Sequence, residues 1–244
     1  MTAARTLASA ARVLRQLRSD PRSIVLMLVA PSLLVGLFAW IFVDAEGVFQ
    51  QVGPAILALF PFIVMFLITS ITTLRERRSG TLERLMTTPL GKADFVVGYA
   101  IAFGAAAIVQ AIVTVAFAVW VCDLEVDGPL WELGLVAVVD ALLGTTLGLL
   151  ASAFARTEFQ AVQFMPLLVF PQILLGGVIM PRENMPDVLE AISDWLPLSY
   201  AIDAVQAVTT GADAWDVYGP LLIILAFATA FILLAALTLR RRTP

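Results

Sequence analysis

The sequence predicts an all-α integral membrane protein with six transmembrane helices. Of its 244 residues, 60% are hydrophobic and only 14% are charged, a balance that is unusual for a soluble domain. A helix needs about 20 apolar residues to cross a hydrocarbon core about 30 Å thick, and the chain has room for six such stretches with short connections. The charged residues fall on alternate sides of these stretches, as expected of a chain that crosses a membrane repeatedly.

Residues 1–23, ahead of the first span, are predicted to form a basic amphipathic helix that lies flat on the inner leaflet and ends before Pro21. Apolar residues recur on one face at helical spacing, at Leu7, Ala11, Leu14 and Leu17. Basic residues fall elsewhere on the helical wheel, at Arg12, Arg15 and Arg18. The alternative is a solvated basic leader that only orients span one.

The six spans are expected over residues 24–43, 52–73, 95–121, 133–155, 160–180 and 221–239. The first has no small-x-small cleavage site after it at 44–47, so we interpret it as a retained span rather than a signal peptide. Fourteen of the 15 basic residues lie before span one, between spans two and three or four and five, or after span six, and Arg182 is the exception. Because Lys and Arg near span ends stay in the cytoplasm, both termini are predicted to be cytoplasmic.

The connection between spans two and three predicts a short helix near residues 79–88. Leu82, Leu85 and Met86 form an apolar stripe, while Glu83 and Arg84 lie on the other face. A helix this short is marginal in water and needs a partner surface. The alternative is a stop-transfer charge cluster followed by a turn.

Residues 181–216, ahead of the last span and basic tail at 217–244, are acidic but too apolar for a plain loop. Two short helices on the outer leaflet are expected on either side of Pro197, with Trp195 and Tyr200 as interface anchors. The first carries an apolar stripe at Val188, Leu189, Ile192, Trp195 and Leu196.

A few polar residues stand inside the predicted spans. Asp140 should face protein or a cavity, because an exposed charge in mid-membrane costs at least about 2.5 kcal/mol, and packing and functional roles are both open for it. Gln110, Gln163 and Gln172 are interpreted mainly as hydrogen-bonding contacts between helices, with a place in a transport pathway as the alternative. Gly144 and Gly148 form a GxxxG step that permits close helix contact.

Several chemistries are excluded by composition. Histidine is absent, which removes Ser-His-Asp and Cys-His nucleophile pairs, His-ligated zinc and axial-His haem, so we expect no catalytic residue and no metal site. The single cysteine, Cys122, cannot form an internal disulfide. No G-x-x-x-x-G-K-[ST] phosphate loop occurs, so no ATP site of that kind is expected in this chain.

Two segments resemble ABC-2 type transporter permeases, and the daunorubicin-resistance type in particular. They are RERRSGTLERLMTTPL at 75–90 and LPLSYAIDAVQAV at 196–208, within a six-span layout that covers the whole chain, 1–244, as one transmembrane domain. The resemblance implies that 1–23 is the connecting helix and that 186–203, with Trp195, Tyr200 and Asp203, forms the outer helices. It further implies a coupling helix that docks in a groove of an ATPase subunit, comprising Gly80, Thr81, Leu82, Glu83 and Leu85, to which the apolar stripe adds Met86.

The same resemblance implies a half-permease of an ATP-driven exporter in a bacterial plasma membrane, of the kind that confers multidrug efflux or antibiotic resistance. Its partners would be a separate ATP-binding subunit that holds ATP and Mg, a second permease copy or a close homologue, membrane lipid, and an amphipathic drug or lipid as substrate, but no nucleic acid. This chain would not itself be an enzyme. A proton-coupled transporter that uses Asp140 as its carrier carboxylate is the main alternative, and a non-transporting assembly or sensor subunit is a third hypothesis.

Overall fold

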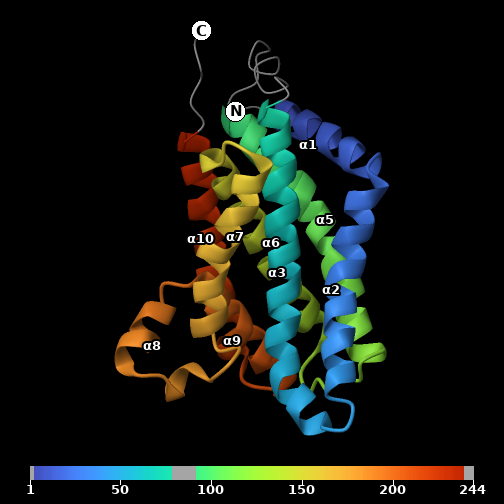
Figure 1. The fold of residues 1–244 in the computed structure, drawn as a ribbon, viewed down its shortest axis with the longest axis vertical. Coiled ribbons are helices and arrows are strands. Elements are labelled where there is room, and N and C mark those ends of the chain that lie inside the picture. The colour runs from blue at the N-terminus through green and yellow to red at the C-terminus, as the bar shows by residue number, and fades with distance from the viewer. Residues whose placement is uncertain (1–2, 79–91, 239–244) are drawn as a thin grey trace.

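A computed structural model describes residues 3–78 and 92–238. Within these residues the chain forms α-helices and one short 3-10 helix, and no strand, which confirms the predicted all-α fold (Figure 1). The elements are α1 (Ala3–Arg18), α2 (Pro21–Ile41), α3 (Glu46–Arg78), α5 (Lys92–Trp120), α6 (Leu130–Phe154), α7 (Glu158–Leu175), η1 (Arg182–Asn184), α8 (Asp187–Ser193), α9 (Pro197–Thr209) and α10 (Ala214–Thr238).

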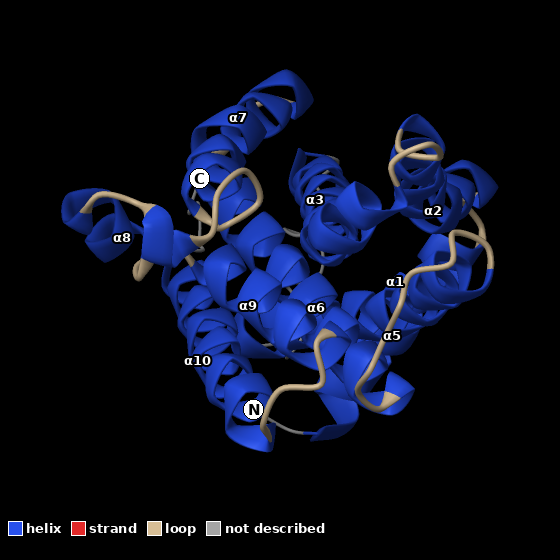
Figure 2. Cartoon of the chain, turned by 90° about the horizontal axis from the view of Figure 1, so that it is seen from below, coloured by secondary structure: helices blue, strands red, loops and turns tan. Residues whose placement is uncertain are grey.

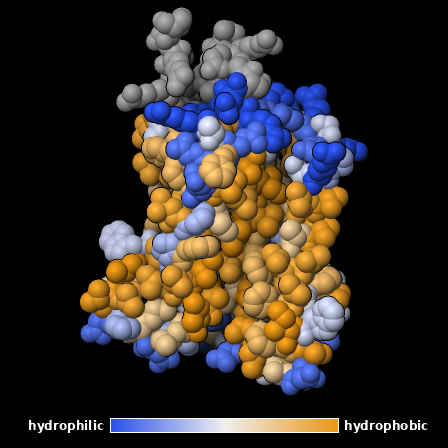
Figure 3. Space-filling model, viewed as in Figure 1, coloured by the Kyte–Doolittle hydropathy of each residue, from blue (hydrophilic) through white to orange (hydrophobic). Residues whose placement is uncertain are grey.

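Six of the described helices are long and apolar enough to cross a membrane: α2, α3, α5, α6, α7 and α10. They match the six predicted spans in order. On the face seen in Figure 3, a wide hydrophobic band separates two hydrophilic ends. One end holds α1 and the last turn of α10, and we call it the α1 end; the opposite end holds α8, α9 and the α2–α3 connection, and we call it the far end (Figure 1).

Local sequence signals account for the helix ends. α2 begins after Asp20, whose carboxylate accepts the backbone N–H of Ser23 at 3.3 Å, and Pro21 occupies the first helical position. α7 ends at Leu175, five residues before the predicted end of span five at 180. The reason is the following Gly176–Gly177 pair, because Gly177 adopts a φ of +93° that L side chains rarely adopt.

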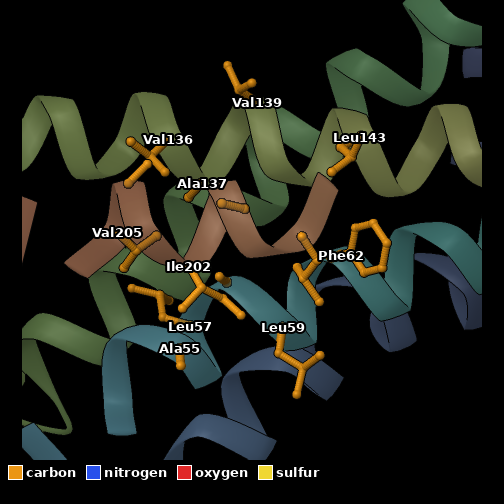
Figure 4. Packing of buried hydrophobic residues seen from close by; sticks show 14 of the residues in the cluster. Ala55, Leu57, Leu59, Phe62, Val136, Ala137, Val139, Leu143, Ile202 and Val205 are labelled. Atoms are coloured by element: carbon orange, nitrogen blue, oxygen red, sulfur yellow. The ribbon is translucent and has the colours of Figure 1, made fainter. Parts of the chain in front are cut away.

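α6 is the central helix, and it packs against α3, α5 and α10. A Cβ atom added at Gly144 would lie 2.4 Å from the carbonyl oxygen of Phe62, and one at Gly148 would lie 2.6 Å from that of Phe66. The GxxxG prediction of close helix contact is therefore confirmed, with α3 as the neighbour. Figure 4 shows the adjoining apolar core, where side chains of α3, α6 and α9 meet.

The outer spans are less covered. Figure 2 shows α7 at the edge of the bundle, and large apolar side chains are exposed along it, among them Phe159, Leu167 and Leu174. An exposed apolar helix of this kind needs lipid or another protein chain around it.

The apolar face predicted for α1 is mostly exposed on this chain. Leu17 is buried, but Leu7 and Leu14 are exposed. The helix instead buries small and polar residues against α5, because Gly98 of α5 lets the two backbones approach: a Cβ atom there would lie 2.7 Å from that of Ser9. The buried face of α1 consists of Thr6, Ser9, Ala10, Val13 and Leu17. The exposed Leu7 and Leu14 remain available for the predicted contact with lipid.

Candidate functional site

The predicted coupling residues, Gly80, Thr81, Leu82, Glu83, Leu85 and Met86, lie outside the described residues. The structure does define the two flanks of this segment, since α3 ends at Arg78 and α5 begins at Lys92. Both flanks are bonded to α1, through side chains that lie close to the segment in sequence. This arrangement of α1, the end of α3 and the start of α5 is the candidate coupling site.

The bond to the first flank is a bidentate ion pair between Arg12 and Glu76. The Arg12 Nη1 and Nη2 atoms donate to the Glu76 Oε1 and Oε2 atoms at 2.8 and 3.0 Å. Arg12 Nη2 also donates to the hydroxyl of Tyr99 at 2.8 Å, and the guanidinium carbon lies 5.7 Å from the centre of that ring. The Glu76 side chain is only 5% exposed and that of Arg12 27%. Such shielded, charge-assisted bonds are stronger than surface ion pairs.

The bond to the second flank joins Thr6 to Asp94. The Thr6 hydroxyl donates to the Asp94 Oδ1 atom at 2.9 Å, and both residues are buried. Tyr99, which accepts from Arg12, lies on the same helix as Asp94. α1 therefore contacts both the helix before the segment and the helix after it.

Further contacts connect the first flank to α6 and α7. Arg75 forms an ion pair with Glu158 at the start of α7, with an Nε to Oε1 distance of 3.1 Å, and Arg77 donates to the backbone carbonyl of Ser152 near the end of α6. Both members of the Arg75 pair are exposed, so this pair adds little stability. It does place the end of α3 beside the start of the least covered span.

The intramembrane glutamines take different positions. Gln110 is buried, and its Nε2 atom donates to the carbonyl of Met27 at 3.1 Å, joining α5 to α2. Gln172 is also buried; its Oε1 atom accepts the N–H of Leu198 at 3.1 Å, joining α7 to α9. These two are contacts between helices, as predicted. Gln163 is exposed on α7 and faces out of this chain.

Asp140 is fully buried in α6, as expected for a charge in mid-span. Among the described residues, neither of its carboxylate oxygens has a hydrogen-bond partner. The buried hydroxyls of Thr69, Ser70 and Thr114 are unpartnered in the same sense. Asp140 takes no part in the hydrogen bonds that join α1 to α3 and α5.

At the far end, the predicted outer helices are present as α8 and α9. Arg182 donates to Ser193 Oγ at 2.8 Å, to Asp203 Oδ2 at 2.6 Å and to Asp194. Tyr200 donates to the carbonyl of Asp194 at 2.8 Å, and its ring lies 5.4 Å from the Arg182 guanidinium carbon. This Arg182 cluster joins the C-terminal end of α8 to α9. Trp195 follows α8 and is exposed, as a lipid-facing anchor would be.

The sequence reasoning missed the contacts of α1 with the two flanks. The sequence did contain a signal for these contacts. Glu76 is an acidic residue inside the basic run RERR, and a carboxylate at such a position is expected to pair with an arginine. The far-end cluster had a clearer signal, because Arg182 is the single basic residue predicted on the acidic side.

Six apolar spans and an N-terminal amphipathic helix define a polytopic α-helical membrane protein. The chain belongs to the ABC-2 type transporter family, whose model matches residues 5–209.

The curated relatives agree with this assignment. The chain is 30% identical over 180 residues to the probable multidrug ABC transporter permease YbhR of Escherichia coli, covering 72% of this chain and 49% of the relative. It is 27% identical over 158 residues to the linearmycin resistance permease protein LnrN of Bacillus subtilis, covering 64% and 41%. It is 25% identical over 193 residues to ABC transporter G family member 20 of Dictyostelium discoideum, covering 78% and 26%. The chain therefore spans about half the length of these relatives, or less.

Proposed function

We propose that this chain is the permease subunit of an ATP-driven exporter, and that a separate ATP-binding subunit supplies the energy. ATP and Mg would be held by that subunit, and this chain would contribute no catalytic residue. The observation that carries the proposal is the attachment of α1 to both flanks of residues 79–91. Family membership supports it, because the segment between those flanks resembles the family's coupling helix.

The attachment gives a physical route for the energy. ATP binding acts on the permease only through a difference in affinity between its conformations. If the ATP-binding subunit binds Leu82, Leu85 and Met86, its closure displaces the end of α3 and the start of α5, and α1 moves with them. Because α3 packs closely on α6, the movement reaches the centre of the bundle.

Two copies, or one copy with a homologue, would enclose the pathway. The exposed apolar face of α7 and its exposed Gln163 support a second permease chain at that edge. For the substrate we propose an amphipathic drug or lipid, in line with the names of YbhR, a probable multidrug permease, and LnrN, a linearmycin resistance permease.

We propose a bacterial plasma membrane location with the α1 end in the cytoplasm. Basic residues concentrate at that end and acidic residues at the far end, as the distribution of charges in membrane proteins predicts. Single cysteines introduced by Ser19→Cys and Asp187→Cys, in a chain with Cys122→Ala, test this in sealed cells. An impermeant maleimide added outside should label only the second, and the reverse pattern would overturn the orientation.

The decisive test of coupling is purification of the tagged chain from its native membrane. We expect an ABC ATP-binding subunit to co-purify and to hydrolyse ATP in the complex. Leu82→Ala combined with Leu85→Ala removes apolar contacts worth about 0.8 kcal/mol per buried CH₂, so it should weaken docking well over tenfold. The double variant should still insert in the membrane. Unchanged affinity for the ATP-binding subunit would place docking elsewhere.

Asp140 supports the competing function, a proton-coupled transporter, because it is buried without a partner among the described residues. Asp140→Asn separates the two functions. An amide keeps the shape and hydrogen-bonding capacity of the carboxyl group, but it does not bind and release a proton as a carrier must. The exporter proposal expects assembly and ATP-driven transport to persist in proteoliposomes. Transport that is driven by a pH gradient without ATP, and that is lost in Asp140→Asn, would favour the competing function.

A further inference from the structure

A groove of about 990 Å³ runs between α2 and α5 at the far-end half of the bundle. Pockets for small ligands commonly enclose about 300–1,000 Å³, so this one is large enough for a drug-sized molecule. The groove is separate from the contacts of α1 and from the exposed face of α7.

The body of the groove is apolar. Leu33 and Leu37 of α2 line one wall, and Val113, Phe117 and Val121 of α5 line the other. At Gly36 of α2, an added Cβ atom would lie 3.0 Å from the ring of Phe117 of α5. Leu33 is 58% exposed although it lines a concave surface, so the groove opens sideways toward the position of the membrane.

The far end of the groove is polar and acidic. Its lining there includes Gln50, Asp123 and Glu125, with the exposed indole of Trp40 close to the end of α2. Gln50 shapes this rim: its Nε2 atom donates to the carbonyl of Asp123 at 2.9 Å, and its Oε1 atom accepts the N–H of Glu125 at 2.9 Å. Asp123 has a φ of +53°, a conformation that Asp tolerates better than most residues.

Neither Asp123 nor Glu125 of this rim forms an ion pair in the part of the chain that the structure describes. An apolar slot that ends in two unpaired carboxylates and an exposed indole complements an apolar body with a positive head, because a cation gains from both the charges and the ring face.

We propose that the α2–α5 groove binds a single-chain amphipathic cation, with its apolar body between Leu33 and Phe117 and its ammonium group at Asp123 and Glu125. A phospholipid fits less well, because its phosphate would lie against the two carboxylates and the Gln50 amide is already committed to the backbone. This site names a substrate class for the exporter and in that sense rests on the proposed function.

The natural single cysteine provides a reporter, since Cys122 lines the groove. The full chain in phosphatidylcholine nanodiscs is labelled with N-ethylmaleimide, with and without dodecyltrimethylammonium. Burial raises the pKa of the Cys122 thiol, so labelling is performed at about pH 8.5. We expect dodecyltrimethylammonium to protect Cys122 at concentrations at least tenfold lower than dodecyl maltoside, which has the same chain and no charge. Dodecylphosphocholine, which adds a phosphate to the same ammonium group, should also protect at least tenfold less well.

Two matched variants locate the site. Leu33→Trp should fill the groove and abolish protection. Leu26→Trp is its control, because Leu26 lies two turns away on the same face of α2, is 60% exposed and does not line the groove. Asp123→Asn with Glu125→Gln should remove the preference for the cation, while the dodecyl group of each amphiphile should still protect Cys122. A photoreactive alkyl trimethylammonium should label α2 and α5 peptides, which gives a readout independent of Cys122.

Equal protection by the three amphiphiles, or retained protection in Leu33→Trp, would overturn the proposal. So would protection of Cys122 in the assembled complex without ligand, which would mean that a second chain covers the groove. The binding test needs neither ATP nor a partner, so its failure is distinguishable from failure of the proposed export. Binding without ATP-driven export of dodecyltrimethylammonium would support the site and contradict its assignment as a substrate site of the exporter.

Discussion

Each end of the molecule contains an arginine that binds carboxylates and lies over a tyrosine ring, but the two clusters join different parts of the chain. Arg12 reaches Glu76 and Tyr99, which are 64 and 87 residues away in sequence. Arg182 reaches Ser193, Asp194 and Asp203, which are 11 to 21 residues away. The first cluster connects three helices, whereas the second joins η1, the end of α8 and α9, which are neighbours along the chain.

The difference teaches that similar chemistry serves different purposes at the two ends. A local cluster stabilises the element that contains it, so its loss destabilises that element. A cluster that joins separate helices also transmits displacement between them. We therefore expect changes at Arg12 to alter coupling and changes at Arg182 to alter local order, and four predictions test this comparison in order of decreasing effect.

The largest effect is expected from Arg12→Ala. The change removes two charge-assisted hydrogen bonds to Glu76 and one to Tyr99, and such bonds contribute about 1.5–3 kcal/mol each. We expect transport-coupled ATP hydrolysis in proteoliposomes to fall at least tenfold, with faster amide exchange in α1. Arg15→Ala is the control, because Arg15 is exposed and its side chain donates to the carbonyl of Ala11 in its own helix. Wild-type coupling in Arg12→Ala would remove the distinction between the two clusters.

The next effect is expected from Arg182→Ala. Loss of the contacts with Asp194 and Asp203 should speed amide exchange in α8 about tenfold or more, while ATP hydrolysis stays coupled to transport. Glu190→Gln serves as a control in the same short helix, since its backbone carbonyl, not its carboxylate, accepts from Ser193. Loss of coupling in Arg182→Ala would indicate that the far end also transmits the conformational change.

A smaller and directly comparable effect is expected from Tyr99→Phe and Tyr200→Phe, each of which removes one hydroxyl. Tyr99 is fully buried and accepts a bond from charged Arg12, so its loss should lower the free energy of unfolding by about 1.5–3 kcal/mol. Tyr200 is half-buried and donates to a neutral carbonyl, so about 0.5–1.5 kcal/mol is expected. Reversible unfolding in mixed micelles measures both, and an inverted order would contradict the assigned burial of the two clusters.

The smallest effect is a pH dependence of opposite sign at the two ends. Burial raises the pKa of Asp203 above 3.8, so its contribution to stability is present below pH 3.8 and is lost as the pH rises through the folded-state pKa. Hydrogen bonds from Ser23 lower the pKa of Asp20 below 3.8, so its contribution is present above pH 3.8 and is lost as the pH falls through the folded-state pKa. Unfolding at about pH 3 and pH 6 of the wild type, Asp203→Asn and Asp20→Asn should show the two signs. If the free energy of unfolding changed equally with pH in all three proteins, the pKa shifts assigned to Asp203 and Asp20 would be refuted.

Much of the fold was predictable, because its signals are local, whereas the contacts of α1 that define the candidate coupling site were not predicted. The apolar runs predicted all six spans, and the Gly144–Gly148 step predicted close packing. The two apolar stripes on either side of Pro197 predicted α8 and α9. Gln110 and Gln172 behaved as contacts between helices. At α1 the exposed Leu7 and Leu14 agree with the predicted lipid-facing side, but the burial of Thr6 and Ser9 on the opposite side was not predicted.

The sequence by itself determined the class of this protein, since span length, hydropathy and charge distribution depend on composition along the chain and on the thickness of a bilayer. Only the tertiary structure decided which helices meet. The pairing of Arg12 with Glu76, the approach of Ser9 to Gly98 and the groove between α2 and α5 depend on residues far apart in the chain. Helical periodicity says which residues share a face, but not which neighbour that face meets. That choice comes from shape and small residues at the contact, which a single sequence does not reveal.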